Sequence, residues 1–160
     1  MTIGGEEVLN EHHLLAYTEN GEMMDSPQSV RFLVIHCSAT RADRNYTDKQ
    51  LMRDHKKRGF RTVGYHFYVH KDGSSTQFRK LLEVGAHARP YNRCSIGICY
   101  EGGLDDEGRP ADTLTRAQYD AMWNTGADCR APRLAGSNSQ GVPLLRCSEK
   151  ISTLMENVEC

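Results

Sequence analysis

Histidine is missing from the last third of this 160-residue chain, whose seven histidines end at His87. Any site that needs an imidazole must therefore take it from the segment up to His87. The six cysteines form no Cys-x-x-Cys pair, which excludes the usual spacing of a structural zinc site or a redox dithiol. No apolar run approaches the length of a membrane-spanning helix, so we expect no membrane span.

Positive charge is missing from residues 1–30, which hold six acidic residues and no Lys or Arg. The mean hydropathy of −0.62 is low for a compact domain and indicates polar tails. We therefore expect residues 1–30 to form an acidic, flexible extension, with Leu14–Tyr17 as a candidate edge strand and His12–His13 in solvent. The start of the chain also lacks the basic and apolar regions of a secretory signal, which favours cytoplasmic synthesis and reduced thiols.

Basic residues are in modest excess in the rest of the chain, with 16 basic against 11 acidic residues over 31–123. An excess this small is typical of a solvated surface. The basic residues do not alternate with aromatic ones, so we expect no nucleic-acid partner. The length suits a single domain.

Local signals predict the order of the elements. The apolar run Phe32–Ile35 predicts a central strand buried on both faces, with His36 just after its end. A capping box at Thr47–Gln50 predicts a helix to about Arg58, where Gly59 can adopt the left-handed conformation. Residues 65–70 and 75–79 are predicted strands joined by a tight Asp-Gly turn.

The second half of the chain has weaker signals. Residues 95–100 predict another strand, and Thr115–Gln118 repeats the capping box. We expect the helix that it begins to end at Met122 or Trp123, because Gly126 and Pro132 follow. Such a short amphipathic helix is marginal unless it is packed.

Three side chains are candidates for chemistry on their own merits. A histidine just after a buried strand is held rigidly, which suits a metal ligand, although His36 could equally be a neutral imidazole bonded to backbone carbonyls. Tyr65 could equally bury its ring and leave its hydroxyl in water. His66 alternates with Tyr65, so both reach one cleft only if the cleft lies at the strand's end. His55 and His70 are expected on the surface, and Cys37, Cys94 and Cys99 in the core.

Several linked motifs carry a resemblance to a known family. They are His36–Thr40, Val63–Phe67, Asp72–Gly73, Val84–Ala88 with Tyr91–Asn92, Ser95–Ile98, Gly102–Asp106 and Leu114–Gln118. In this order and spacing the chain resembles the zinc-dependent N-acetylmuramoyl-L-alanine amidases of the phage-lysozyme type and the related peptidoglycan-recognition proteins. The resemblance covers residues 31 to about 123.

The resemblance implies a single α/β domain with a mixed central β-sheet flanked by helices. It implies that zinc activates water to hydrolyse the amide between the lactyl group and L-alanine of peptidoglycan. By position, His36 resembles the first zinc ligand and Tyr65 the catalytic tyrosine, which can donate a hydrogen bond to an oxyanion. His66, His87 and Asn92 would line the substrate cleft, and we expect a monomer.

The resemblance fails in residues 124–160, which we treat as a divergent C-terminal segment after an amidase-like domain at 31–123. The family takes its other zinc ligands from this region, where the chain has no histidine and only Cys147 stands near the expected place. A catalytic zinc needs three protein ligands, so we expect weak or no zinc binding. The alternative to a zinc amidase is a module that binds peptidoglycan without catalysis.

Overall fold

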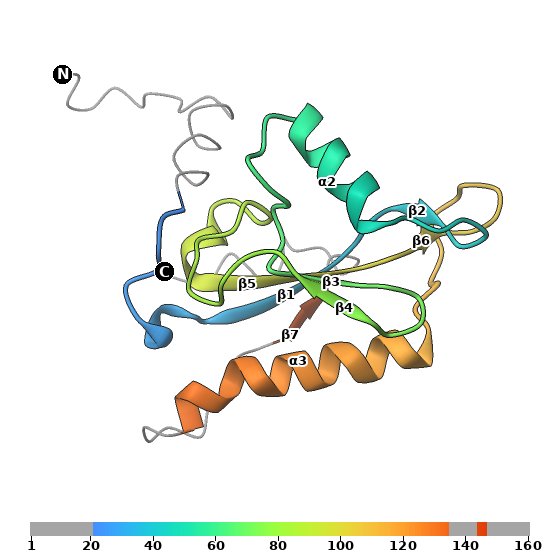
Figure 1. The fold of residues 1–160 in the computed structure, drawn as a ribbon. Helices are drawn as coiled ribbons and strands as arrows, with labels where there is room; N and C mark the ends of the chain where they lie inside the picture. Colours follow the sequence, from blue (N-terminus) through green and yellow to red (C-terminus); the bar gives the residue numbers. More distant parts are fainter. Residues whose placement is uncertain (1–20, 135–143, 147–160) are drawn as a thin grey trace.

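The computed structural model describes residues 21–134 and 144–146, and it shows a five-stranded sheet with a helix on each face (Figure 1). The strand order is β4-β3-β5-β1-β7. The strands are β1 (Phe32–Cys37), β3 (Phe67–Val69), β4 (Ser75–Gln77), β5 (Ser95–Tyr100) and β7 (Leu144–Arg146). Only β4 runs antiparallel to its neighbour, so the mixed α/β sheet that we predicted is confirmed.

The centre of the sheet is the parallel pair β1 and β5, whose register sets Phe32 opposite Ser95 and His36 opposite Cys99. Both strands are buried over their first five residues, as expected for central strands covered on both faces. β1 extends through Cys37, so His36 lies inside the strand and not just after it. This position fixes the backbone of His36 through its pairing with Cys99 of β5.

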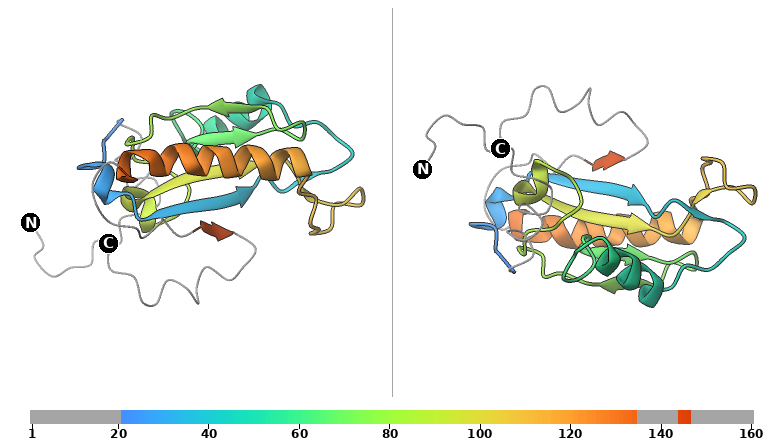
Figure 2. Two further views of the ribbon diagram at one scale, coloured as in Figure 1. Left: turned by 90° about the horizontal axis from the view of Figure 1, so that it is seen from below. Right: turned by 90° about the horizontal axis from the view of Figure 1, so that it is seen from above.

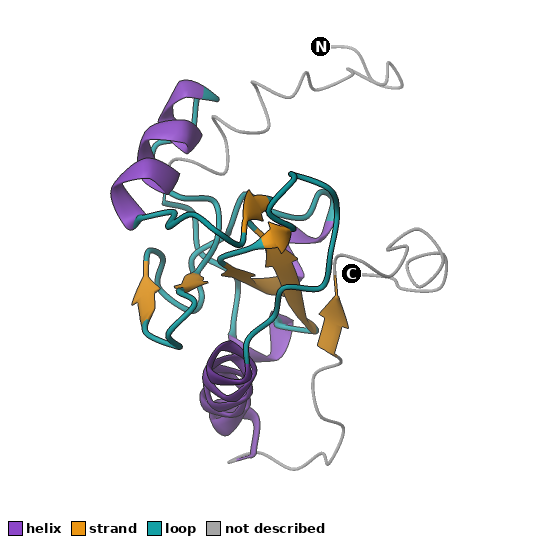
Figure 3. Cartoon of the chain, turned by 90° about the vertical axis from the view of Figure 1, so that its right-hand side faces the viewer, coloured by secondary structure: helices purple, strands orange, loops and turns teal. Residues whose placement is uncertain are grey.

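The two helices lie on opposite sides of the sheet (Figures 2 and 3). Helix α2 (Asp48–Lys57) begins with the predicted capping box, in which Thr47 Oγ1 accepts from the backbone N–H of Gln50. Gly59, with a φ of 92°, follows its C-terminal cap. The prediction of this helix is confirmed because all its signals are local in the sequence.

Helix α3 (Arg116–Leu134) is longer than we predicted and includes both Gly126 and Pro132. Propensity alone disfavours these residues in a helix by about 1 and 3 kcal/mol. Packing on the sheet opposes that cost: Met122 is buried, and Gln118 Nε2 donates to the backbone carbonyls of Val69 and Glu101. The predicted end at Met122 or Trp123 is therefore wrong, and the helix covers the sheet.

The apolar side chains form one cluster under α3 and two on the opposite face. Leu33 and Ile35 of β1 face α3 together with Ile96 and Ile98 of β5. Since side chains alternate along a strand, Val34 and His36 face the other side, where α2 lies. The functional candidates must therefore be sought on the α2 face.

The remaining elements are short. A 3-10 helix η1 (Pro27–Ser29) precedes β1, a second one, η2 (Tyr91–Cys94), precedes β5, and β2 (Thr40–Arg41) pairs with β6 (Gly103–Leu104). Met24 and Val30 are buried in the core, so the packed structure begins before Arg31 and the predicted extension is too long at this end. The candidate strand Leu14–Tyr17, the pair His12–His13 and Cys147 lie outside the described residues. Among the helices that the structure describes, none is long and apolar enough to cross a membrane.

Candidate active site

Three predicted side chains meet above the central strands on the α2 face. The ring centroids of His36 and Tyr65 are 5.1 Å apart, and His87 lies 5.1 Å from His36 and 6.4 Å from Tyr65. His36 is 8% exposed, whereas Tyr65 and His87 are half-buried. Tyr65 stands before β3 begins, so it reaches the cluster from the strand's end.

Gly97 makes room for the ring of His87. It lies in β5 next to His36's strand, and a Cβ at this position would stand 2.6 Å from Cγ of His87 and 2.7 Å from its Nδ1. A real Cβ essentially never tolerates such contacts, so the imidazole occupies the space that a side chain would fill. Gly97 is a functional residue that sequence reasoning did not single out.

Hydrogen bonds define the protonation of the two imidazoles. Ser95 Oγ donates to the carbonyl of Tyr91 at 2.6 Å, so it can only accept from His87 Nε2, which lies 3.4 Å away. The Nδ1 atom of His87 then carries a lone pair and accepts from His36 Nε2 at 3.0 Å. This assignment leaves Nδ1 of His36 as the ring nitrogen with a lone pair for other ligands.

Burial keeps these rings uncharged at neutral pH. It lowers the pKa of His36 from 6.5 to about 4. Burial also holds the pKa of His87 well below its usual value, with further lowering from His36, His66 and Arg79 nearby. The site therefore offers neutral imidazoles, the form that can accept a proton or bind a metal.

His66 is fully buried and does not line the cleft, so its predicted contact with substrate is wrong. Its Nδ1 accepts from the backbone N–H of Gly97 at 3.1 Å, and its Nε2 donates to the carbonyl of Glu83 at 2.6 Å. With both nitrogens bonded to backbone and its pKa lowered by burial to about 4, it is a neutral structural residue. It ties β5 to the segment that leads to His87.

Asn92 holds the backbone of the His87 loop. Its Oδ1 accepts from the N–H groups of His87 and Ala88, both at 2.9 Å. Asn92 is half-buried, and both bonds are made by its Oδ1. The structure therefore gives Asn92 a positioning contact beside His87 that the sequence did not indicate, and its contact with substrate stays a prediction.

A buried arginine connects the two segments that carry Tyr65 and His87. Arg79 is 1% exposed and donates from Nε to the carbonyl of Val63 and from Nη1 to that of Val84. The carboxylate of Glu83 lies 3.4 Å from the same Nη1. Nothing in the local pattern signals this role, because its partners lie in other segments.

Two predictions about surface residues need correction. His55 is 5% exposed, accepts from the backbone N–H of Gly64, and lies 5.3 Å from the Tyr65 ring. Its spacing of four from buried Leu51 was the signal for a core position. His70 is half-buried, with its Nε2 2.9 Å from a carboxylate oxygen of Asp48.

The cysteine predictions are also partly wrong. Cys94 and Cys99 are buried as expected, whereas Cys37 is half-buried. Cys94 is disulfide-bonded, so the expectation of reduced thiols fails there, while Cys37 and Cys99 are free.

The described residues alone do not fit a catalytic zinc. Across 21–134 and 144–146 there is no group of three His, Cys, Asp or Glu side chains that could hold a metal ion. His36 offers one lone pair, and a catalytic zinc needs three protein ligands. We therefore derive no chemical step through a metal.

Comparison with known proteins identifies the family of this chain. Residues 26–133 match the family described as N-acetylmuramoyl-L-alanine amidase, so the chain belongs to that family. The match continues along α3 beyond the motifs that carried the resemblance. The family is generally zinc-dependent.

Two phage endolysins support the assignment. The endolysin of Escherichia phage T7 is 38% identical over 95 residues, which cover 59% of this chain and 63% of that protein. That of Enterobacteria phage T3 is 40% identical over 56% of this chain and 60% of the relative. The chain thus spans slightly less than two thirds of the length of these relatives.

Solved structures share the fold. An N-acetylmuramoyl-L-alanine amidase from Clostridium intestinale matches with a TM-score of 0.59 and 27% identity, over 76% of this chain and 72% of that one. Wild-type Drosophila PGRP-LB matches with a TM-score of 0.62 and 25% identity, over 78% and 72%. The predicted family and fold class are confirmed.

Replacing Gly97 with alanine tests whether His87 depends on the bare backbone. The new Cβ would overlap the ring, so we expect His87 to be displaced and the free energy of unfolding to fall by about 1–3 kcal/mol. Urea unfolding measures this loss. The matched control is Gly97→Ala in a His87→Ala background, where the cost should shrink; an equal cost in both backgrounds would contradict the packing.

Acid should destabilise the fold through its buried histidines. His36, His55 and His66 have pKa values near 4 in the fold against 6.5 when exposed, so the unfolded chain binds more protons between these pH values. Stability is then full above pH 6.5 and falls as the pH decreases toward 4, by on the order of 2–3 kcal/mol per histidine. Urea midpoints at pH 7.5 and 5.0 measure this fall, and equal midpoints would refute it.

Proposed function

We propose that the chain hydrolyses peptidoglycan as an N-acetylmuramoyl-L-alanine amidase, cutting the amide between the lactyl group and L-alanine. The observation that carries this proposal is the meeting of His36, Tyr65 and His87 in a domain of the amidase family. The endolysin relatives support a wall substrate.

Tyr65 is the proposed catalytic residue. Attack on an amide carbonyl places negative charge on its oxygen, and a phenol O–H can donate to that oxyanion. Its ring lies against both His36 and His55. These contacts fix the ring on two sides, which limits the reorganisation needed in the transition state.

His87 and Asn92 are the proposed substrate contacts. His87 is half-buried, and Asn92 fixes its backbone through two hydrogen bonds. A neutral imidazole and a carboxamide suit an uncharged sugar and amide better than a phosphate. The proposed ligand is therefore a muropeptide.

His36 is the proposed metal ligand, through its Nδ1 lone pair. One imidazole falls short of a catalytic set, and Cys147, the weak second candidate, lies outside the described residues. We propose that zinc binds weakly to this chain, in contrast to the general dependence of the family.

The shortage of metal ligands favours a second candidate function, a peptidoglycan-binding module without catalysis. The clustered rings are held by contacts within residues 21–134. Incubation with purified cell wall separates the two functions: an amidase releases dye from labelled wall, whereas a module only sediments with it.

The cellular setting is also proposed. We infer synthesis in the cytoplasm and action on the wall after lysis or export, in keeping with the name endolysin of the relatives. We propose a monomer with an amidase-like domain, an acidic segment before it and a divergent segment after it.

The variant Tyr65→Phe should lower turnover about 10²–10³-fold without loss of binding. Removing one oxyanion donor costs about 10²–10³ in kcat, while the ring keeps its packing against His36. Dye release and wall sedimentation measure the two properties. The control is Tyr119→Phe on the outer face of α3, which is 41% exposed and should change neither; unaltered dye release by Tyr65→Phe would exclude the phenol from catalysis.

Zinc titration tests the ligand count. Equilibrium dialysis of the purified chain should show no tight one-to-one binding, and His36→Ala should weaken what remains. His70→Ala is the control, because His70 lies beside Asp48 and not in the ring cluster. Tight stoichiometric zinc in the unaltered chain would overturn the prediction.

A further inference from the structure

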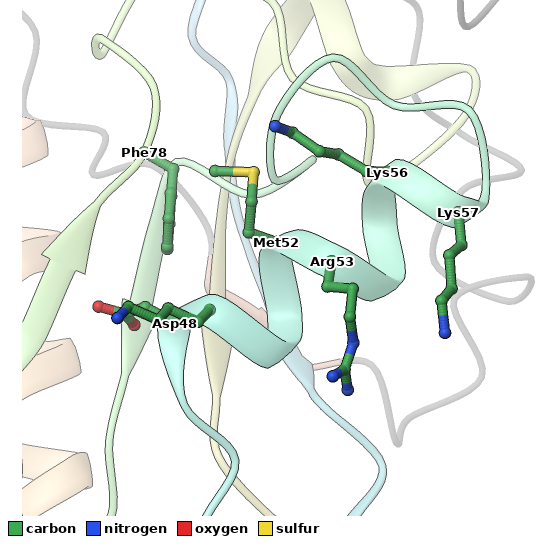
Figure 4. A pocket seen from close by; sticks show the side chains of 7 residues that line it. Asp48, Met52, Arg53, Lys56, Lys57 and Phe78 are labelled. Atoms are coloured by element: carbon green, nitrogen blue, oxygen red, sulfur yellow. The ribbon is translucent and has the colours of Figure 1, made fainter.

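A groove on α2 is lined by none of the ring-cluster residues His36, Tyr65 and His87, and it has an apolar floor with a basic rim. It has a volume of about 690 Å³. Met52 of α2 and Phe78, just after β4, face one another across it (Figure 4). Its rim holds four cationic side chains and one acidic one: Lys49, Arg53, Lys56, Lys57 and Asp48.

The cations of this rim are poorly balanced. Arg53 stands four residues after Lys49 and four before Lys57, a spacing at which like charges on a helix repel. The one acid is already engaged, since Asp48 accepts from Thr76 Oγ1 at 2.7 Å. Arg53 lies 3.4 Å from Asp54, and no ion pair links the three lysines to any described residue. The groove therefore suits an acidic partner with apolar side chains.

We propose that the groove binds residues 1–20 of the same chain. This segment carries four glutamates and no Lys or Arg, opposite in charge to the rim. Its apolar stretch Leu14–Tyr17 is flanked by Glu11 and Glu19, and the groove combines two apolar side chains with four cationic ones. The inference does not depend on amidase activity.

The described structure starts at Gly21, beside the side chain of a residue that follows α2. The guanidinium of Arg61 lies 3.9 Å from where a Cβ on Gly21 would stand, and Arg61 follows the end of α2 closely. A helix the length of α2 spans about 15 Å. Seven extended residues before Gly21 span roughly 25 Å, which exceeds the length of α2.

Carbodiimide cross-linking of the full chain tests the contact directly, since it joins a glutamate to a lysine only when the two touch. We expect links from Glu6, Glu7, Glu11 or Glu19 to Lys49, Lys56 or Lys57. Their yield should exceed links to Lys80, an exposed lysine outside the groove, by about tenfold. One molar salt should remove them, because it screens charges within about 3 Å.

A mixture of ¹⁴N- and ¹⁵N-labelled chains identifies the occupant. Links within one isotope support the proposal, whereas mixed-isotope links would show that a second copy fills the groove and would overturn it. Equal yields at Lys80, or no links at all, would also overturn it.

Charge reversal provides the matched variants. Lys56→Glu with Lys57→Glu alters two exposed positions in the last turn of α2 and should cut the links to Lys49 about tenfold, with a fall in the free energy of unfolding of no more than about 1–2 kcal/mol. Adding Glu11→Lys and Glu19→Lys should restore protection of the groove against a lysine-specific reagent at Lys49. Failure of this restoration would contradict a charge-matched contact.

Discussion

The imidazole of His87 packs against the backbone of β5 at Gly97, and the geometry of the site follows from that contact. Gly97 leaves the space, and the ring that fills it reaches His36 on the neighbouring strand. The same glycine donates its N–H to His66, so one residue contacts two imidazoles in different ways. A larger residue at this point would separate the rings, even though the sheet itself could still form.

Neutral histidines then couple the site to the fold. Burial makes protonation of His36, His55 and His66 costly, so the arrangement persists only where these rings stay uncharged. Arg79 carries the fixed positive charge nearby, and Glu83 lies close enough to compensate it. The buried polar groups on the α2 face thus include neutral histidines and the ion pair of Arg79 with Glu83. At neutral pH these imidazoles offer lone pairs and carry no positive charge.

The sequence predicted those features that local signals determine. The capping box at Thr47 and the glycine after Arg58 fix α2 without reference to the rest of the chain, and the apolar run of β1 requires burial wherever it lies. Helix α3 was underestimated because its glycine and proline disfavour a helix locally, whereas the contacts of Gln118 and Met122 with the rest of the fold are not visible in the local pattern. His66 was misassigned for a similar reason: its partners, Glu83 and Gly97, lie in other segments, and no periodic pattern reveals them.

The proposed recognition of a muropeptide and its proposed hydrolysis depend on different parts of this chain. The ring cluster lies within residues 21–134, where His36 and His87 are hydrogen-bonded to each other and His66 is bonded to the backbone of Glu83 and Gly97. A catalytic zinc would need at least two more ligands than His36, and the described residues supply no such group. The contacts proposed for a muropeptide therefore lie among residues that the structure describes, whereas the proposed hydrolysis depends on metal ligands that these residues do not supply.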